Sequence, residues 1–162
     1  MSTLLKPPYQ YVMDSSALFD LKSQYPKTIF PGVWERVNEM FLHKMIVAPR
    51  EVLKEIKNGN DELVDWAEEF EDNFLEPTDE ELLVVQSILA CYPPHIISKY
   101  SIRAWADPFV LGCAKFYRLP IIQHETHDPN QFKIPAIALT HKIKCLRLPQ
   151  FFEEENWSFV SE

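Results

Sequence analysis

The chain has 162 residues, 46% of them hydrophobic and 13% aromatic, and carries a formal net charge of −8. This length supports one compact domain with a substantial core, so we expect a single domain over residues 1–162. Three glycines are too few for a glycine-rich phosphate loop. Three widely spaced cysteines indicate neither a disulfide framework nor a structural zinc site.

The N-terminus and the cysteine usage indicate a cytoplasmic protein. The segment "MSTLLKPPYQ" lacks the apolar core of a signal peptide, and no window approaches ~20 uninterrupted apolar residues. Three unpaired thiols fit a reducing compartment. We therefore expect a cytoplasmic protein with no membrane-spanning segment.

The charge is unevenly distributed along the chain. Residues 51–81 contain 13 acidic and two basic side chains, a net charge of −11, whereas residues 82–150 contain three acidic and eight basic ones, a net charge of +5. The overall charge argues against nonspecific nucleic-acid binding by the whole surface. The basic region could still contact a polyanion.

In chain order, the first third predicts a strand, two helices and a second strand. "YQYVM" (9–13) is typical of a strand, and residues 17–24 of a short helix. "PGVWERVNEMFLHK" (31–44) places its apolar residues on one helical face, and "MIVA" (45–48) is a short buried strand.

The middle of the chain is predicted to be helical. "PREVLKEIKNGN" (49–60) reads as a helix with proline in its first turn and Asn-Gly as its end. Residues 61–74 place apolar side chains opposite a dense acidic face, most simply a solvated helix surface. Thr78 and Glu81 form a capping-box pattern before another helix. Residues from about 60 to 103 are expected to be a helical, partly acidic, insertion-like region and a candidate partner surface.

The last third continues the alternation of helices and strands. Asp107 and Pro108 are expected to be the N-cap and first turn of a buried helix over residues 109–117. "LPIIQ" (119–123) and "KCLRL" (144–148) predict buried strands, with short helices expected in "IPAIALTHK" and "PQFFEEE". Strands that are apolar throughout and separated by helices predict an α/β fold, a three-layer α/β/α sandwich with a central, mainly parallel sheet.

Acidic residues follow the predicted strands, where ligands bind in such sheets. They are Asp14, Glu51, Glu55, Asp107 and Glu125, of which Glu51 and Glu55 share one helix face. Each has a simpler explanation, because Asp14 and Asp107 could be helix caps and the glutamates could be surface charges. Together they need a cation to coexist ionised. Oxygen ligands suit Mg²⁺ or Mn²⁺, which activate water at phosphodiesters, so the set predicts a metal-dependent nuclease.

Four segments resemble, in order and spacing, the PIN domains, and especially the toxin ribonucleases of prokaryotic toxin-antitoxin systems. They are "YVMDSSALFDL", "IVAPREVLKEI", "WADPFVLGCAKFYRLPIIQHE" and "KCLRL", and the resemblance extends from Tyr11 to Phe152. It implies an Mg²⁺- or Mn²⁺-dependent endoribonuclease that cleaves RNA, binds a cognate antitoxin protein and forms a homodimer. The implied metal ligands and catalytic residues are Asp14, Glu55, Asp107 and Glu125, with Ser16 supporting the site.

The sequence departs from the family pattern at the last acidic position. In "QHET", Gln123 stands at the usual Thr place and Glu125 at the usual Asp place, and Asp128 is an alternative fourth ligand. This departure motivates a second hypothesis, a catalytically weak PIN-like module that acts by binding protein. A small-molecule phosphatase is less consistent with the sequence, because "DSS" lacks the second carboxylate of a D-x-D motif.

Basic residues and histidines complete the candidates. Arg50, Lys54 and Arg103 are candidate substrate-binding residues, and further candidate phosphate contacts are Lys99, Lys115 and Lys133. His124 and His127 could be zinc ligands, but no third His or Cys stands at ligand spacing.

Overall fold

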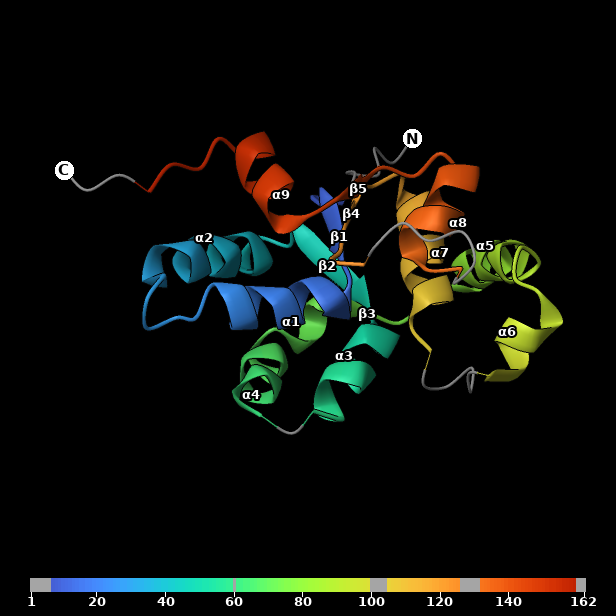
Figure 1. The fold of residues 1–162 in the computed structure, drawn as a ribbon, viewed down its shortest axis with the longest axis horizontal. Coiled ribbons are helices and arrows are strands. Elements are labelled where there is room, and N and C mark those ends of the chain that lie inside the picture. Colours follow the sequence, from blue (N-terminus) through green and yellow to red (C-terminus); the bar gives the residue numbers. More distant parts are fainter. Residues whose placement is uncertain (1–6, 60, 100–104, 126–131, 160–162) are drawn as a thin grey trace, which may run out of the picture.

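The computed structural model describes residues 7–59, 61–99, 105–125 and 132–159, except for the side chain of Lys99. Five parallel strands form one sheet in the order β3-β2-β1-β4-β5 (Figure 1). The strands are β1 (Tyr11–Met13), β2 (Ile46–Pro49), β3 (Phe74–Leu75), β4 (Ile121–Ile122) and β5 (Cys145–Leu146). At the centre, Val12 is in register with Val47 of β2 and with Ile121 of β4.

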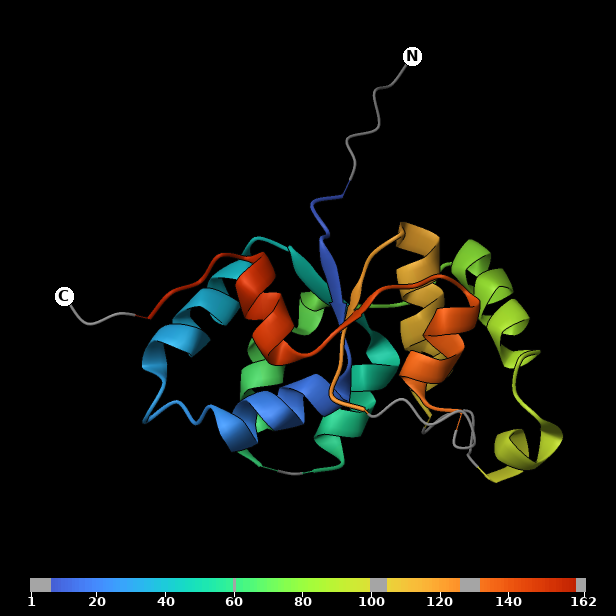
Figure 2. The same cartoon turned by 45° about the horizontal axis from the view of Figure 1, so that its top comes forward.

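Helices cover both faces of the sheet. In the described residues they are α1 (Ser15–Gln24), α2 (Pro31–Leu42), α3 (Arg50–Lys57), α4 (Glu62–Glu69), α5 (Asp79–Leu89), α6 (Pro94–Lys99), α7 (Asp107–Tyr117), α8 (Ile134–Thr140) and α9 (Leu148–Glu154), with a 3₁₀ turn η1 (Glu71–Asn73). Helices α1, α2 and α9 lie to one side of the strands, and α5, α7 and α8 lie to the other (Figures 1 and 2). The predicted three-layer α/β/α sandwich is confirmed.

The central strands are buried on both faces, as their uninterrupted apolar sequences predict. Val12, Met13, Val47 and Ile121 are all 0% exposed. Burying a side chain of this size stabilises the fold by about 1.5–3 kcal/mol. These strands therefore belong to one hydrophobic core that the helices of both layers complete.

The helix expected over residues 61–74 ends early, because a strand follows it. Helix α4 stops at Glu69, and Phe74 begins β3 at the edge of the sheet. Asn73 makes this change of direction, since its buried side-chain amide donates to the carbonyls of Phe41 (2.7 Å) and Ile46 (2.9 Å). These long-range hydrogen bonds could not be predicted from the apolar periodicity of the segment.

Helix α5 packs closely on α7. A Cβ atom added to Gly112 of α7 would lie 2.5 Å from Cγ2 of Val85, so the glycine permits this approach. Thr78 caps α5 as expected, accepting from the backbone N–H of Glu81 (3.1 Å). The buried Glu81 carboxylate accepts from the Tyr117 hydroxyl at 3.0 Å. The described part of residues 60–103 thus contributes α4, a sheet strand and a core helix, together with α6, which the sequence did not predict.

No helix among the described residues is long and apolar enough to cross a membrane.

Candidate functional site

Asp14 caps a helix and keeps one carboxylate oxygen without a partner. It follows β1, and its backbone N–H donates to the carbonyl of Ile122 (2.9 Å), which holds it at the carboxyl edge of the sheet. Its Oδ2 caps α1 by accepting from the backbone N–H (3.3 Å) and the hydroxyl (2.6 Å) of Ser16. Its Oδ1 is buried with no hydrogen-bond partner. One oxygen is therefore satisfied by capping, and the other remains available to a ligand.

Glu55 reaches the same edge from α3, which begins directly after β2. Its carboxylate accepts hydrogen bonds from the side chain of Ser15 and the backbone of Ala106, while its Oε1 is buried without a partner. Burial, and then the charge of Asp14, raise the pKa of Glu55 to about 7. When no cation is present, the Glu55 carboxyl group is therefore partly protonated near neutral pH.

Glu51 lies on the same helix in a different environment. Burial raises its pKa, and the charges that act on it are those of Lys54, Glu76 and Glu81. Glu55, by contrast, responds to Asp14 and Glu125. Of the two glutamates that share this helix face, Glu55 is the one electrostatically coupled to the other candidate residues.

Asp107 is not the helix N-cap that the sequence predicted. Ala106 occupies that position without a side-chain cap bond, and Asp107 is the first residue of α7. Pro108 follows it within the first turn, so the helix starts one residue earlier than the Asp-Pro pair suggested. Burial, followed by the charges of Asp14, Glu125 and Glu55, raises the pKa of Asp107 well above its ordinary value.

Glu125 is held by the start of α8. Its Oε2 accepts from the backbone N–H of Ile134 at 3.0 Å, and both this bond and Lys133 favour its charged form. Burial and the charge of Asp14 outweigh them and raise its pKa. The alternative ligand, Asp128, lies outside the described residues. The longer Glu side chain in "QHET" is thus half-buried and coupled to the cluster.

We call Asp14, Glu55, Asp107 and Glu125 the carboxylate cluster. Its members come from four segments, and Lys133 favours the charged forms of Asp14, Asp107 and Glu125. Burial is the main cause of the raised pKa values of all four groups, and the mutual repulsion that one lysine cannot balance adds to it for Glu55, Asp107 and Glu125.

The donor set fits a hard divalent cation in its chemistry. Each buried acceptor without a donor costs about 1–3 kcal/mol, and Asp14 Oδ1 and Glu55 Oε1 are two such atoms. Carboxylate oxygens are the ligands of Mg²⁺ and Mn²⁺. In the described part of the chain, no three His, Cys, Asp or Glu side chains are arranged to hold a metal ion as they stand. Binding would therefore require the carboxylates to draw together.

Two further residues, Tyr92 and His124, border the cluster. The hydroxyl of Tyr92 is buried without a partner, and its pKa is raised by burial and then by the charges of Asp107 and Glu125. The ring of Tyr92 contacts that of Trp105 edge to face, with centroids 4.6 Å apart. The backbone N–H of His124 donates to Ser16 Oγ at 3.0 Å. No sequence pattern singled out Tyr92, which follows α5 and precedes two prolines.

The candidate phosphate contacts have different surroundings. Arg50 pairs with Glu71 (3.3 Å) and Glu76 (3.2 Å), and Lys54 is exposed. Lys133 borders the carboxylate cluster, as its effect on three carboxyl groups shows. Arg103 and the side chain of Lys99 lie outside the described residues.

The histidines next to Glu125 give no support to a zinc site. His124 Nδ1 lies 3.1 Å from Asp20 Oδ2, and the guanidinium of Arg147 lies 2.9 Å from the same nitrogen. His127 lies outside the described residues. His124 is therefore in contact with Asp20 on α1 and with Arg147, which precedes α9.

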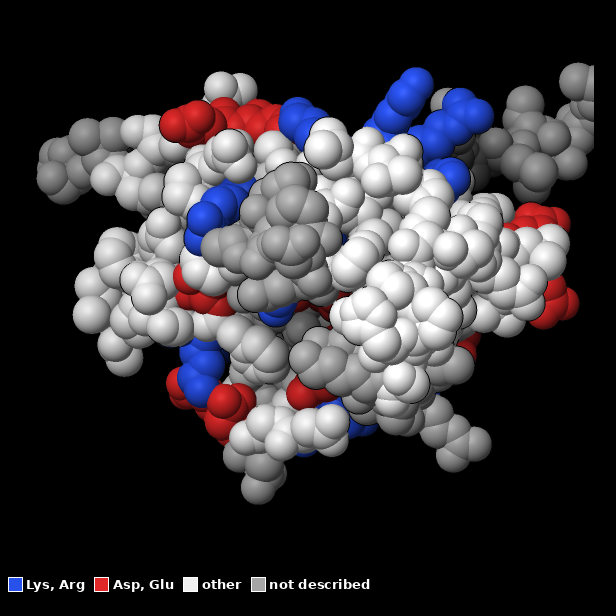
Figure 3. Space-filling view, turned by 45° about the vertical axis from the view of Figure 1, so that its right-hand side comes forward, with Lys and Arg blue, Asp and Glu red and all other residues white. Residues whose placement is uncertain are grey.

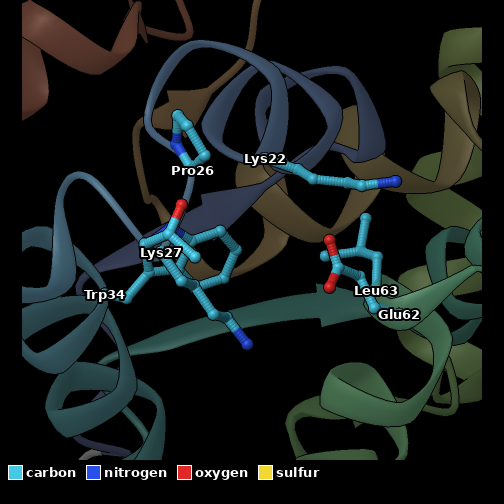
Figure 4. A pocket seen from close by; sticks show the side chains of 7 residues that line it. Lys22, Pro26, Lys27, Trp34, Glu62 and Leu63 are labelled. Carbon is cyan, nitrogen blue, oxygen red and sulfur yellow. The ribbon is translucent and has the colours of Figure 1, made fainter.

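A small pocket opens elsewhere, between α1, the loop that follows it, α2 and α4. Figure 4 shows its lining, with the ammonium of Lys27 4.6 Å from the ring centroid of Trp34 and with Lys22, Glu62 and Leu63 across the opening. Its volume is about 90 Å³, whereas ligand pockets hold roughly 300–1,000 Å³. None of the carboxylate cluster lines it, so we assign it no role in the candidate chemistry.

Comparison with known proteins identifies a family but indicates no activity. A family model described as "Domain of unknown function (DUF4411)" matches residues 11–159. A search of curated proteins gave no match.

Proposed function

This chain belongs to the DUF4411 family, and we propose that it is a metal-dependent endoribonuclease that hydrolyses RNA phosphodiester bonds. The observation that carries the proposal is the carboxylate cluster. Four acidic side chains from separate segments act on one another's ionisation at the carboxyl edge of a parallel sheet, where ligands bind in this architecture. Perturbed carboxyl groups gathered at such an edge are typical of functional sites.

Asp14, Glu55, Asp107 and Glu125 would hold Mg²⁺ or Mn²⁺. The cation would supply positive charge that stabilises the phosphodiester as negative charge develops on it. The protein's own part begins with Asp14, which Ser16 orients through a short hydrogen bond. Glu55 holds a proton near neutral pH and releases it when positive charge arrives. Lys133, beside the cluster, would contact a phosphate oxygen.

The sequence resemblance supports the wider biological role. We propose that the chain is the toxin of a toxin-antitoxin pair, with a cognate antitoxin protein that blocks the carboxylate cluster and with a homodimeric state. These proposals rest on the resemblance to PIN toxins. Co-purification of a small protein encoded next to this chain, followed by loss of its inhibition on mixing with excess RNA substrate, would test the first of them.

RNA cleavage by the purified protein tests the proposed activity. Single-stranded RNA is incubated with Mn²⁺, with Mn²⁺ plus excess EDTA, and with the variant Asp14→Asn. We expect EDTA to abolish cleavage and Asp14→Asn to reduce its rate by about 100-fold or more, because the variant removes a ligand of the cation that would stabilise the developing negative charge. Asp65→Asn, at an exposed position of α4, is the matched control and should cleave normally. Cleavage that survives both EDTA and Asp14→Asn would refute the assignment.

A second candidate is a protein-binding module with little catalysis. It is favoured by the absence of a ready metal-binding group among the described residues and by the bond that ties Glu125 to Ile134. Calorimetric titration with Mn²⁺ separates the two functions. Heat of binding that disappears in Asp14→Asn supports the nuclease, and no binding at millimolar Mn²⁺ supports the module.

A further inference from the structure

A basic hollow lies at the end of the domain opposite the carboxylate cluster. Its volume is about 420 Å³, and it opens where α7 and α8 end. The basic residues in its lining are Lys115, Arg118, His141, Lys142 and Lys144. Lys and Arg side chains gather toward the upper right of Figure 3, at the end of the molecule where these helices terminate in Figure 1. Four of the eight Lys and Arg residues in the basic region 82–150 thus line one concave surface.

The positive charge of the hollow is not neutralised locally. Its four Lys and Arg side chains face one carboxylate, Glu154, which pairs with Lys144 at 3.0 Å. Each helix end contributes roughly −0.5 of an elementary charge, so the two helix ends leave a clear positive excess. Lys115 lies 2.8 Å from His141 Nδ1, and burial and this lysine lower the histidine pKa. His141 is therefore neutral at pH 7, and the lysine is held in place.

Two of the cations occupy backbone positions that disfavour them. Arg118 and Lys142 both have φ of 58°, a left-handed conformation that glycine adopts freely. For other residues it costs roughly 1–2 kcal/mol, whereas a cation at an exposed helix C-terminus returns about 0.3–1 kcal/mol. The conformation closes each helix, because the next backbone N–H donates back into it at 2.9 Å, from Leu119 to Ala114 and from Ile143 to Ala138. Among the described residues, neither pairs with a carboxylate.

The hollow and the carboxylate cluster are joined by two helices. Helix α7 begins at Asp107 and ends beside Arg118, and α8 begins beside Lys133 and ends beside His141. At 1.5 Å per residue, α7 spans about 16 Å, a distance that a few nucleotides of extended RNA can bridge. One strand of RNA could therefore contact both ends of these helices.

We propose that the basic hollow binds backbone phosphates of single-stranded RNA whose scissile bond lies at the carboxylate cluster. This inference rests on the proposed ribonuclease function. RNA is favoured over an acidic protein segment because the cations of the hollow lie at the far ends of the two helices that begin at Asp107 and beside Lys133, so one polyanionic strand could contact both regions.

The test is binding of a fluorescein-labelled, 12-nucleotide RNA of mixed sequence, measured by anisotropy in EDTA so that no cleavage is needed. The variant Arg118→Asn/Lys142→Asn removes two charges while asparagine still tolerates the left-handed backbone. The control Lys27→Asn/Lys44→Asn removes the same charge elsewhere, and Lys44 also has φ of 58°. We expect the test variant to bind on the order of tenfold more weakly and its salt slope to fall by about 1.4, with the control near wild type.

Equal affinity and equal salt slope in the test variant and the wild type would overturn the proposal. So would a poly-glutamate peptide of matching charge that binds as tightly as the RNA, since this would identify an acidic protein as the partner. Failure of the ribonuclease proposal has a different signature, because it is read from cleavage in Mn²⁺. Wild-type binding by the hollow variant together with loss of cleavage in Asp14→Asn would reject the hollow and retain the nuclease.

Discussion

The hydroxyl of Ser16 donates a hydrogen bond to Oδ2 of Asp14 at 2.6 Å, at the start of α1. The same hydroxyl accepts from the backbone N–H of His124 at 3.0 Å. One side chain therefore joins the segment after β1 to the segment after β4. Oδ2 of Asp14 is therefore hydrogen-bonded, whereas Oδ1 is buried and has no hydrogen-bond partner.

The variant Ser16→Ala should loosen this arrangement while leaving the fold intact. Groups that orient metal ligands typically contribute 10- to 100-fold to metal affinity or activity. We expect RNA cleavage and Mn²⁺ affinity to fall by about tenfold, with a loss of about 1 kcal/mol in the free energy of unfolding. Ser23→Ala, at an exposed position of the same helix, is the control. Unchanged Mn²⁺ affinity in Ser16→Ala would show that the hydroxyl does not position Asp14 for a cation.

Glu55 predicts an unusual pH dependence of stability in the metal-free protein. Its pKa is about 7 in the folded state, above its ordinary value of 4.5, so the native state binds a proton that the unfolded state has released. The stability that this proton confers is fully present below about pH 4.5 and is lost as pH rises through about 7.

Glu55→Gln should remove this dependence, because an amide needs no proton. In EDTA at pH 8, we expect the Tm of Glu55→Gln to exceed that of the wild type by on the order of 3 °C, with little difference at pH 5. Glu68→Gln, on the exposed side of α4, is the control. Thermal melts of both proteins between pH 5 and pH 8 measure this difference. The prediction is contradicted if the Tm of the wild type increases relative to that of Glu55→Gln as the pH rises.

Tyr92 and Tyr117 provide a matched pair of hydroxyls. That of Tyr92 is buried without a partner, whereas that of Tyr117 donates to Glu81 at 3.0 Å. Removing an unpaired buried polar group relieves a desolvation cost, and removing a paired one leaves its partner unsatisfied. In urea denaturation, Tyr92→Phe should therefore be neutral or more stable by about 1 kcal/mol, and Tyr117→Phe less stable by about 1–2 kcal/mol. Equal destabilisation of the two variants would show that Tyr92 has a partner in solution.

Gly112 predicts a steric effect on the packing of α5 against α7. In Gly112→Ala the new Cβ would lie 2.5 Å from Val85 Cγ2 and 3.5 Å from Val85 Cα, so the helices would have to separate. Overpacking of this kind costs typically about 1–3 kcal/mol. Adding Val85→Ala should recover part of the loss, which a double-mutant cycle in urea would measure. Gly59→Ala, at an exposed helix end, is the control, and additive effects at 112 and 85 would rule out the contact.

Local patterns were sufficient to predict most of the architecture. Uninterrupted apolar runs such as those around Val12 and Ile121 identify strands buried on both faces, since only a doubly covered sheet excludes polar residues from both sides of a strand. The order of strands and helices then predicts a parallel sheet. The strand at Phe74 was missed because two residues carry no periodicity and because Asn73, which places it, acts through carbonyls distant in the sequence.

The candidate site divides in the same way. The positions of Asp14, Glu55 and Glu125 after strands could be read from the chain, because the carboxyl ends of parallel strands meet at one edge. Tyr92 could not be predicted, since its hydroxyl borders the cluster only through the packing of the turn after α5. The role of Asp107 as a helix cap was also wrong, because backbone geometry alone decides which residue precedes a helix.

By itself, the sequence determined which segments are helices and which are buried strands, and in what order they follow. From this order come the layers, the parallel sheet and the edge at which the acidic residues follow the strands. Those properties follow from local hydrophobic periodicity and chain order. Only the tertiary structure decided that Asp107 begins α7, that the hydroxyl of Tyr92 borders the cluster, and that scattered lysines and arginines meet in one hollow. These depend on side-chain direction and on contacts between distant segments, which no local pattern encodes.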